Sequence, residues 1–225
     1  MGARVFVWLG GALFVVSLGV CVWCYIVVMG RQTPAAAWPP LAFDAALITI
    51  FAVHHSLFAR ERVKEWLAHR VPASLLRSVY VWVASLLLMV VCVLWRPIGG
   101  EIYAATGIRA IAHAVIQLAG VWITARAVAR IDPLELAGIR QATGAQRLQV
   151  TGAYRWVRHP LYLGWVLAVF GAARMTGDRL AFAAITTIYL VVAIPWEERS
   201  LLKSFGEEYA RYVRDVTWRM IPFIY

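Results

Sequence analysis

The sequence predicts an all-α, polytopic membrane protein: a bundle of about six membrane-spanning helices, the fifth and sixth forming a hairpin, followed by a C-terminal amphipathic helix. Hydrophobic residues make up 62% of the 225-residue chain and charged residues only 15%, against roughly 45–50% and about 25% in soluble domains. Apolar runs of about 20 residues, the length that crosses a bilayer, recur along the chain. Because these runs use most of the residues, residues 1–225 are interpreted as a single integral-membrane domain.

The six predicted spans follow from the apolar runs and the residues that interrupt them. They cover residues 5–29, 39–59, 78–95, 108–128, 160–173 and 180–196. The first is too long for the apolar region of a cleaved signal peptide, so we expect it to remain as an anchor. The fifth is short and requires tilt, a thinner bilayer or packing against other helices. After Glu197, apolar residues recur at helical spacing opposite charged ones, which predicts an amphipathic helix against the membrane or the protein; they are Leu201, Phe205, Tyr209 and Tyr212.

Positive charge predicts the orientation of the chain. The net charge is +10, and 17 of the 22 lysines and arginines are cytoplasmic if both termini lie inside. We therefore expect a multi-pass protein of the bacterial inner membrane with cytoplasmic termini. Membrane lipids are the expected partners of the basic loops. Nucleic acid is not, because no basic motif with interleaved aromatic residues lies outside the spans.

The cysteine and histidine patterns do not predict a metal site. Cys21 and Cys24 have the spacing of a redox or metal motif, but no second pair accompanies them and they lie in an apolar run, which indicates core packing. The histidines lack the spacing of a metal-binding helix. His54 and His55 are adjacent, and neighbouring helical residues point about 100° apart, so the two cannot face one pocket equally.

The strongest functional signal is Arg158-His159-Pro160-Leu161-Tyr162-Leu163-Gly164, at the mouth of the predicted hairpin. Its far end carries Glu197-Glu198-Arg199, so two antiparallel helices would bring the basic and acidic groups face to face. Ionisable residues at a membrane edge usually mark a functional site. Arginine, imidazole and carboxylate together suit a ligand with a carboxylate, an amine and an apolar or planar part. The alternative is an ion pair that sets the insertion depth of the helices.

These two motifs resemble the core of integral-membrane methyltransferases, which include isoprenylcysteine carboxyl methyltransferases and phospholipid N-methyltransferases. The matching segments are 152–164 and 197–209, within a similar region of roughly 130–223. The resemblance implies that S-adenosylmethionine (SAM) binds in the C-terminal hairpin, and that residues 130–225 form the cofactor-binding part. The cofactor residues that it implies are Tyr154, Arg158, His159, Tyr162, Leu163, Gly164, Glu197 and Glu198.

Weaker motifs in the N-terminal half resemble the methanethiol S-methyltransferase branch and its NnrU-like relatives. They are His55-Ser56, Arg77-Ser78-Val79-Tyr80, Trp95-Arg96-Pro97-Ile98 and Leu136-Ala137-Gly138-Ile139-Arg140-Gln141. Spans one to four, residues 1–129, would then serve the substrate, and the expected reaction is methylation of a small thiol, methanethiol to dimethyl sulfide. A thiol titrates near about 8.5 and needs little help to become a nucleophile, so holding it in line with the methyl group is the main task. The candidate catalytic residues are His55, Arg77, Tyr80, Arg140 and Gln141, and His54 is a further candidate on the substrate side.

Three alternatives stay open at this point. The acceptor is a lipid amine or an isoprenylcysteine carboxyl group if the pocket opens laterally, and a small thiol if it is closed. A sterol-type reductase that uses NADPH would need a larger basic cluster than the loop before Tyr154 provides. An NnrU-like accessory protein without enzymatic activity would keep the bundle without needing Glu197.

Overall fold

Among the residues that this computed structural model describes, five helices are long and apolar enough to cross a membrane, which confirms the predicted membrane bundle. The structure describes residues 2–34, 38–58, 60–130, 133–140 and 147–225. The five spans are Gly2–Val28, Pro39–Phe58, Ala73–Leu94, Gly107–Val128 and Gly177–Phe205. The predicted fifth span is a shorter apolar helix, Pro160–Phe170. Its 11 residues rise about 16 Å, half the thickness of a hydrocarbon core.

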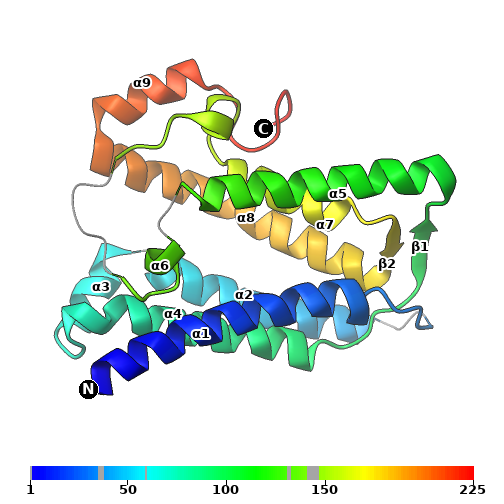
Figure 1. The fold of residues 1–225 in the computed structure, drawn as a ribbon, viewed down its shortest axis with the longest axis horizontal. Coiled ribbons are helices and arrows are strands. Elements are labelled where there is room, and N and C mark those ends of the chain that lie inside the picture. The colour runs from blue at the N-terminus through cyan, green and yellow to red at the C-terminus, as the bar shows by residue number, and fades with distance from the viewer. Residues whose placement is uncertain (1, 35–37, 59, 131–132, 141–146) are drawn as a thin grey trace. The chain divides into compact units, whose positions relative to one another are not determined.

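The described elements follow in chain order (Figure 1). They are α1 (Gly2–Trp23), the π-helix η1 (Cys24–Val28), α2 (Trp38–Phe58), α3 (Glu61–Ala68), α4 (Ala73–Leu94), β1 (Glu101–Ala104), α5 (Gly107–Val128), α6 (Pro133–Leu136), the 3₁₀ turn η2 (Gly152–Arg155), α7 (Pro160–Phe170), β2 (Arg174–Thr176), α8 (Gly177–Phe205) and α9 (Glu207–Asp215). Strands β1 and β2 pair as a two-stranded sheet that the sequence did not predict.

The chain forms two compact units. Unit 1 holds residues 1–100, 132–143 and 176–181, and unit 2 holds residues 101–131, 144–175 and 182–225. In unit 1, α4 packs against both α1 and α2. In unit 2, α5 packs against α7 over their lengths, and Figure 1 shows the two helices side by side. The predicted division of the chain at residue 129, into a substrate part and a cofactor part, stays a prediction. Helix α5, which precedes that residue, packs against α7 of the C-terminal hairpin.

Two side chains at the start of α8, Arg179 and Asp178, satisfy polar groups elsewhere in unit 1. These groups lie in η1 and in the segment after α4. The guanidinium of Arg179 donates to the carbonyls of Tyr25 and Ile26, at 3.1 and 2.8 Å, where the helix widens into η1. The carboxylate of Asp178 accepts from the Trp95 indole at 2.8 Å and from two backbone N–H groups, Ile98 at 2.9 Å and Gly99 at 2.8 Å. Buried polar groups that lack a partner are costly, so these bonds fix the irregular segment after α4.

Close packing of α5 and α7 depends on glycine. A Cβ on Gly164 would lie 2.8 Å from the Gly120 carbonyl oxygen and 2.8 Å from the backbone nitrogen of Thr124. A Cβ on Gly120 would in turn lie 2.6 Å from the Gly164 carbonyl oxygen. Small residues that let helix backbones touch are the usual contact between membrane helices.

The C-terminal amphipathic region differs from its prediction in one respect. The sequence predicts a separate amphipathic helix after Glu197, but α8 continues to Phe205 and α9 begins only at Glu207. Gly206 separates them with φ +51, a conformation that favours glycine. The predicted apolar face is directed toward the protein, since Tyr209, Tyr212 and Val216 form a buried cluster. Leu148, Leu201, Phe205 and Val213 pack around it.

Candidate functional site

The candidate site begins at the first turn of α7, at the mouth of the α7–α8 hairpin. Pro160 occupies the first position of the helix and His159 precedes it as the cap residue, as the sequence predicts. The His159 carbonyl accepts from the N–H groups of Tyr162 and Leu163, both at 3.1 Å. The rings of His159 and Tyr162 stack with centroids 5.4 Å apart. The local fold therefore fixes the imidazole against a phenol ring.

The C-terminal segment after α9 runs beside this turn and holds it. The N–H groups of Arg158 and His159 donate to the carbonyls of Trp218 and Arg219, at 2.9 and 2.8 Å. One guanidinium nitrogen of Arg158 also donates to the carbonyls of Val216 and Thr217. Arg158 is therefore a buried clamp between two segments about 60 residues apart, and most of its donors are already used.

Glu198 is the anion at the centre of a buried ion cluster. Its carboxylate lies 2.6 Å from Arg158 Nε, 3.2 Å from Arg219 Nε and 3.4 Å from His159 Nε2. The side chains of Glu198 and Arg158 are only 13% and 5% exposed. A buried charge needs this degree of compensation. Glu198 therefore neutralises the charges of its neighbours.

Glu197 has a different environment. Its side chain is 48% exposed, and its carboxylate accepts a hydrogen bond from the Tyr162 hydroxyl at 2.9 Å. The same oxygen lies 3.4 Å from His159 Nδ1. Both adjacent glutamates therefore reach His159, one at each ring nitrogen, although only Glu197 keeps substantial access to solvent. The basic groups at the start of α7 and the acidic groups of α8 therefore contact one another at the hairpin mouth, as the sequence predicts.

The two carboxylates act on the pKa of His159. Burial lowers the pKa of this imidazole, but the hydrogen-bonding and electrostatic effects of Glu197 and Glu198 outweigh burial and raise the pKa above its usual value. The pKa values of the nearby tyrosines, which lie outside the spans, are raised as well, because burial disfavours their charged form. Burial raises the pKa of Tyr209 to about 12 and also raises the pKa of Tyr154, helped there by the charge of Glu197.

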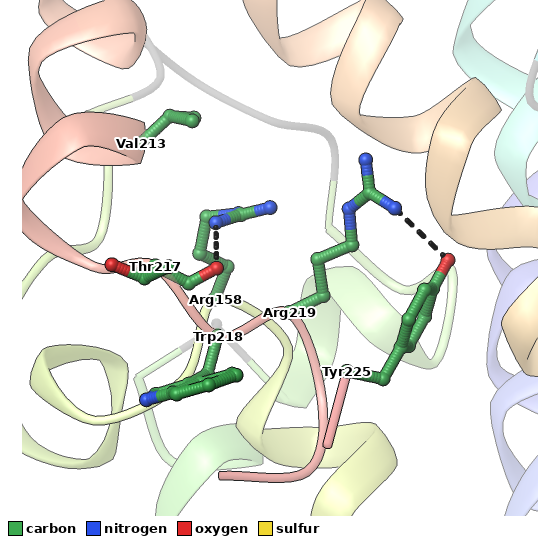
Figure 2. A pocket seen from close by; sticks show the side chains of 6 residues that line it. All are labelled: Arg158, Val213, Thr217, Trp218, Arg219 and Tyr225. Atoms are coloured by element: carbon green, nitrogen blue, oxygen red, sulfur yellow. Dashed lines mark hydrogen bonds between the residues drawn. The ribbon is translucent and has the colours of Figure 1, made fainter. Parts of the chain in front are cut away.

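Two hollows flank this ion cluster, and Arg219 lines both. One, of about 330 Å³, is lined by Arg158, Val213, Thr217, Trp218, Arg219 and Tyr225. Figure 2 shows the guanidinium groups of Arg158 and Arg219 extending between Val213 and the aromatic rings, with Arg219 bonded to the Tyr225 hydroxyl at 3.2 Å. The other, of about 420 Å³, lies between α8 and α9. Both volumes fall within the usual range for small-molecule sites.

The second hollow contains a polar group that lacks a partner. The Tyr209 hydroxyl is buried and has no hydrogen-bond partner of good geometry among the described residues. The walls also carry Glu198, Arg199 and Arg219 beside apolar side chains of Pro195 and Leu202. A site with cations, one carboxylate, a free hydroxyl and apolar surface can hold an amphoteric ligand with an apolar part.

Some residues of the predicted cofactor set have local structural partners. The Tyr154 carbonyl, in η2, accepts from the Tyr212 hydroxyl at 2.7 Å, which ties the loop before α7 to α9. The missing side chain of Gly164 is accounted for by its contact with α5. Leu163 is half-buried on α7. The cluster holds five residues that the sequence singled out, together with Arg219, which it did not; the five are Arg158, His159, Tyr162, Glu197 and Glu198.

Three of the predicted substrate-side residues gather in unit 1. Tyr80 Oη and His55 Nδ1 are joined by a hydrogen bond of 2.6 Å. Arg77, one turn before Tyr80 on α4, donates to the Glu135 carbonyl at 2.5 Å and so ties α4 to α6. Arg140 is exposed in the turn after α6, and Gln141 lies outside the described residues.

No sequence pattern predicts a role for the aromatic and basic groups of the C-terminal segment. Trp218, Arg219 and Tyr225 lie beyond the last helix, with no periodic pattern, yet they line the first hollow. Arg219 is the more accessible cation of the cluster, since its side chain is 38% exposed. The backbone pairing of the segment with residues 158 and 159, together with the bonds of the Arg158 guanidinium to the Val216 and Thr217 carbonyls, holds it at the site.

Comparison with known proteins decides the family. Residues 108–208 match the family model described as phospholipid methyltransferase. The methanethiol S-methyltransferase of Pseudomonas deceptionensis is 36% identical over 81% of this chain and 74% of its own length. Those of Crocosphaera subtropica and Mycobacterium tuberculosis are both 37% identical, over 82% and 77% of this chain and 75% of each relative.

The chain belongs to the methanethiol S-methyltransferase family. It is therefore a membrane methyltransferase, as the motif resemblance predicted. A methyl donor is implied by this chemistry. The match to the phospholipid methyltransferase model begins at the first turn of α5 and ends within α9, and so includes α7 and both glutamates of the cluster.

This chain is also similar, at lower identity, to a protein of another name. Nurim of Bos taurus is 27% identical over 72% of this chain and 68% of its own length. No solved structure matches the chain.

Proposed function

We propose that this methyltransferase transfers a methyl group from SAM to a small thiol, converting methanethiol to dimethyl sulfide. The observation that carries the proposal is the similarity to three methanethiol S-methyltransferases across about three-quarters of their length. When bound, SAM supplies an electrophilic methyl group on a sulfonium. The protein has to bind the donor, hold the thiol in line and exclude water.

The donor site that we propose is the hairpin mouth of unit 2. Glu197, half-exposed and oriented by the Tyr162 hydroxyl, would accept hydrogen bonds from the donor's ammonium group. Arg219 would receive its carboxylate, because it is the more exposed cation and lines both hollows. Arg158, His159 and Glu198 would hold these two groups in place through the buried ion cluster. We also propose that the donor site is lined by Tyr154, Leu163 and Gly164.

The acceptor side that we propose lies among His55, Arg77 and Tyr80 in unit 1, with Arg140 and Gln141 following in the chain. The hydrogen bond between Tyr80 and His55 supports the proposal, because it fixes the orientation of both rings. Arg77 would orient the α6 turn through its bond to the Glu135 carbonyl. A small, uncharged thiol and its thioether product both partition readily into apolar surroundings, which suits a site within membrane helices.

We also propose a location and orientation. The charge asymmetry of the sequence supports a bacterial inner-membrane protein with both termini in the cytoplasm. The mouth of the α7–α8 hairpin would then open toward cytoplasmic SAM. Cysteine-accessibility labelling at each terminus in intact cells tests this, and labelling of either terminus from the periplasmic side contradicts it.

The test of the activity uses the purified protein in lipid nanodiscs with radiolabelled SAM. Methanethiol, hydrogen sulfide, phosphatidylethanolamine and a prenylated cysteine are compared as acceptors. We expect saturable transfer to methanethiol with dimethyl sulfide as the volatile product. Transfer to the lipid amine alone would favour the activity named by the matched family model. Absence of transfer to every thiol would refute the proposed acceptor.

A further inference from the structure

A turn at the end of unit 2, residues 220–225, displays two apolar side chains. Phe223 and Ile224 are 85% and 76% exposed. The N–H of Ile224 donates to the Ile221 carbonyl at 3.1 Å, which closes a β-turn with Pro222 and Phe223 at its two central positions. Further backbone bonds close the base of the turn. The backbone therefore holds a phenylalanine and an isoleucine at the tip of a closed loop.

The backbone of Phe223 is strained. Its φ is 65°, and among the described residues it is the one non-glycine residue with a positive φ. Proline at the first central position and a positive φ at the second are the features of a type II turn, where glycine or asparagine is usual. A bulky side chain in this conformation is an outlier, and such strain tends to occur where function needs it. The ring of Phe223 therefore points to a role that glycine could not fill.

The turn lies at the edge of the apolar layer of unit 2. The N–H groups of residues 158 and 159 donate to the carbonyls of residues 218 and 219, at 2.9 and 2.8 Å. Pro160 follows directly and begins the apolar helix α7. The turn starts one residue after the same pairing. Its backbone is therefore fixed close to the point at which the chain enters the apolar helices.

Two exposed tryptophans mark the same boundary. Trp156, four residues before α7, is 69% exposed, and Trp196, at the end of the apolar run of α8, is 57% exposed. The guanidinium of Arg199 lies 4.9 Å from the centre of the Trp196 ring. Tryptophan and arginine at the ends of apolar helices are typical of the headgroup layer of a membrane. Membrane lipid is therefore the occupant that fits the apolar tip of the turn.

We propose that the turn of residues 220–225 inserts Phe223 and Ile224 into the interfacial layer of the membrane, and that this contact steadies the wall of the adjoining hollow. Transfer of the two side chains out of water is favourable and offsets the strained backbone. A second copy of the chain is the competing partner for the same tip.

The turn is coupled to the hollow through its aromatic neighbours. The rings of Phe223 and Trp218 lie with centroids 5.4 Å apart. The Tyr225 hydroxyl, at the base of the turn, accepts from the Arg219 guanidinium at 3.2 Å, as Figure 2 shows. Trp218, Arg219 and Tyr225 all line the first hollow. This part of the inference rests on the proposed function, in which Arg219 receives the carboxylate of the methyl donor.

The insertion is tested by fluorescence from a single label. Phe223→Cys and Arg211→Cys are each labelled with an environment-sensitive dye, in nanodiscs of phosphatidylcholine with and without a nitroxide near the top of the acyl chain. Arg211 is the matched control, because it is exposed on the charged face of α9. The native cysteines are buried and compete poorly for the dye. We expect quenching to be about threefold or more stronger at position 223, as interfacial burial of an apolar segment requires.

Two results of this experiment overturn the insertion. Equal quenching at both positions would place the tip in water. A blue-shifted label at position 223 that the nitroxide lipid does not quench would assign the tip to a second copy of the chain. Neither result depends on catalysis, so the insertion is tested separately from the proposed function.

The coupling is tested by the affinity for SAM in nanodiscs. Phe223→Gly removes the ring and tolerates the positive φ, so the variant folds without strain. Phe223→Trp keeps an interfacial aromatic residue and serves as the control. We expect the Kd for SAM to rise about fivefold in Phe223→Gly, because the side chains of the wall must then be ordered on binding, and to stay within about twofold in Phe223→Trp. Wild-type affinity in Phe223→Gly would overturn the coupling, whereas a wild-type protein that binds no SAM would overturn the proposed donor site itself.

Discussion

The two adjacent glutamates of α8 should respond oppositely to the same substitution. Glu198 compensates two arginines and a histidine in a buried cluster, whereas Glu197 is half-exposed and shares one hydroxyl. Glu198→Gln removes the negative charge but keeps the shape, so Arg158 and Arg219 lose their counter-ion. Glu197→Gln also keeps the shape, but it leaves no buried cation without a partner. The pair is therefore a matched comparison at neighbouring positions.

The magnitudes follow from burial. Breaking a buried ion pair from one side costs about 3–5 kcal/mol. Arg158 keeps its bonds to the Val216 and Thr217 carbonyls, which places Glu198→Gln near the lower end, about 3 kcal/mol. An exposed pair contributes about 0–1 kcal/mol, which is the expected cost of Glu197→Gln. For a chain of this length the melting temperature should fall by about 6–12 °C in the first variant and by less than about 4 °C in the second.

The assays are thermal unfolding of the detergent-solubilised protein and equilibrium binding of SAM. Glu197→Gln should weaken SAM binding about tenfold or more, because a hydrogen bond between charged groups contributes about 1.5–3 kcal/mol and each 1.4 kcal/mol is a factor of ten. Equal destabilisation by both variants would refute the reasoning from burial. Unchanged SAM affinity in Glu197→Gln would refute the proposed donor contact and favour a non-enzymatic role for this surface.

Three further predictions concern packing, buried polar groups and pH. Gly164→Ala forces a Cβ against the Gly120 backbone and should destabilise the protein by about 1–3 kcal/mol, measured by chemical unfolding, with Gly19→Ala, where a Cβ meets nothing, as the neutral control. Asp178→Ala leaves an indole and two backbone donors without their acceptor and should cost about 3–5 kcal/mol in the same assay; a loss below about 1 kcal/mol would show that these groups find other partners. The raised pKa of His159 means that its protonated form is stabilised in the folded state. Its contribution should be complete below the unfolded pKa of about 6.5 and disappear as pH rises through the higher folded pKa, so the stability gap between wild type and His159→Asn should narrow from pH 6 to pH 9.

Much of the fold could be predicted because the bilayer imposes simple rules. Apolar runs of fixed length gave the spans with small boundary errors, and the short run after Pro160 gave the short α7. The extension of α8 through Trp196 to Phe205 was missed. Glu197, Glu198 and Arg199 end an apolar run without ending a helix, since charge changes the surroundings of a helix but does not break its backbone bonds.

The α5–α7 contact shows a different limit of sequence reasoning. Gly164 belongs to the motif of residues 158–164, which carries the strongest functional signal in the sequence. Gly120, its partner across the interface, stands in an ordinary apolar run. The packing between two helices depends on which faces meet, and that choice is made only when the chain folds.

By itself, the sequence determined that this is a membrane protein of helical spans with a charged hairpin mouth, because hydropathy and segment length act locally along the chain. It also determined that His159 meets the glutamates, since two antiparallel helices of that length must return. The tertiary structure alone decided which glutamate is buried and brought Arg219 to the site. Those outcomes depend on a C-terminal segment that pairs with Arg158 and His159 through backbone bonds, and such pairing leaves no periodic trace in the sequence.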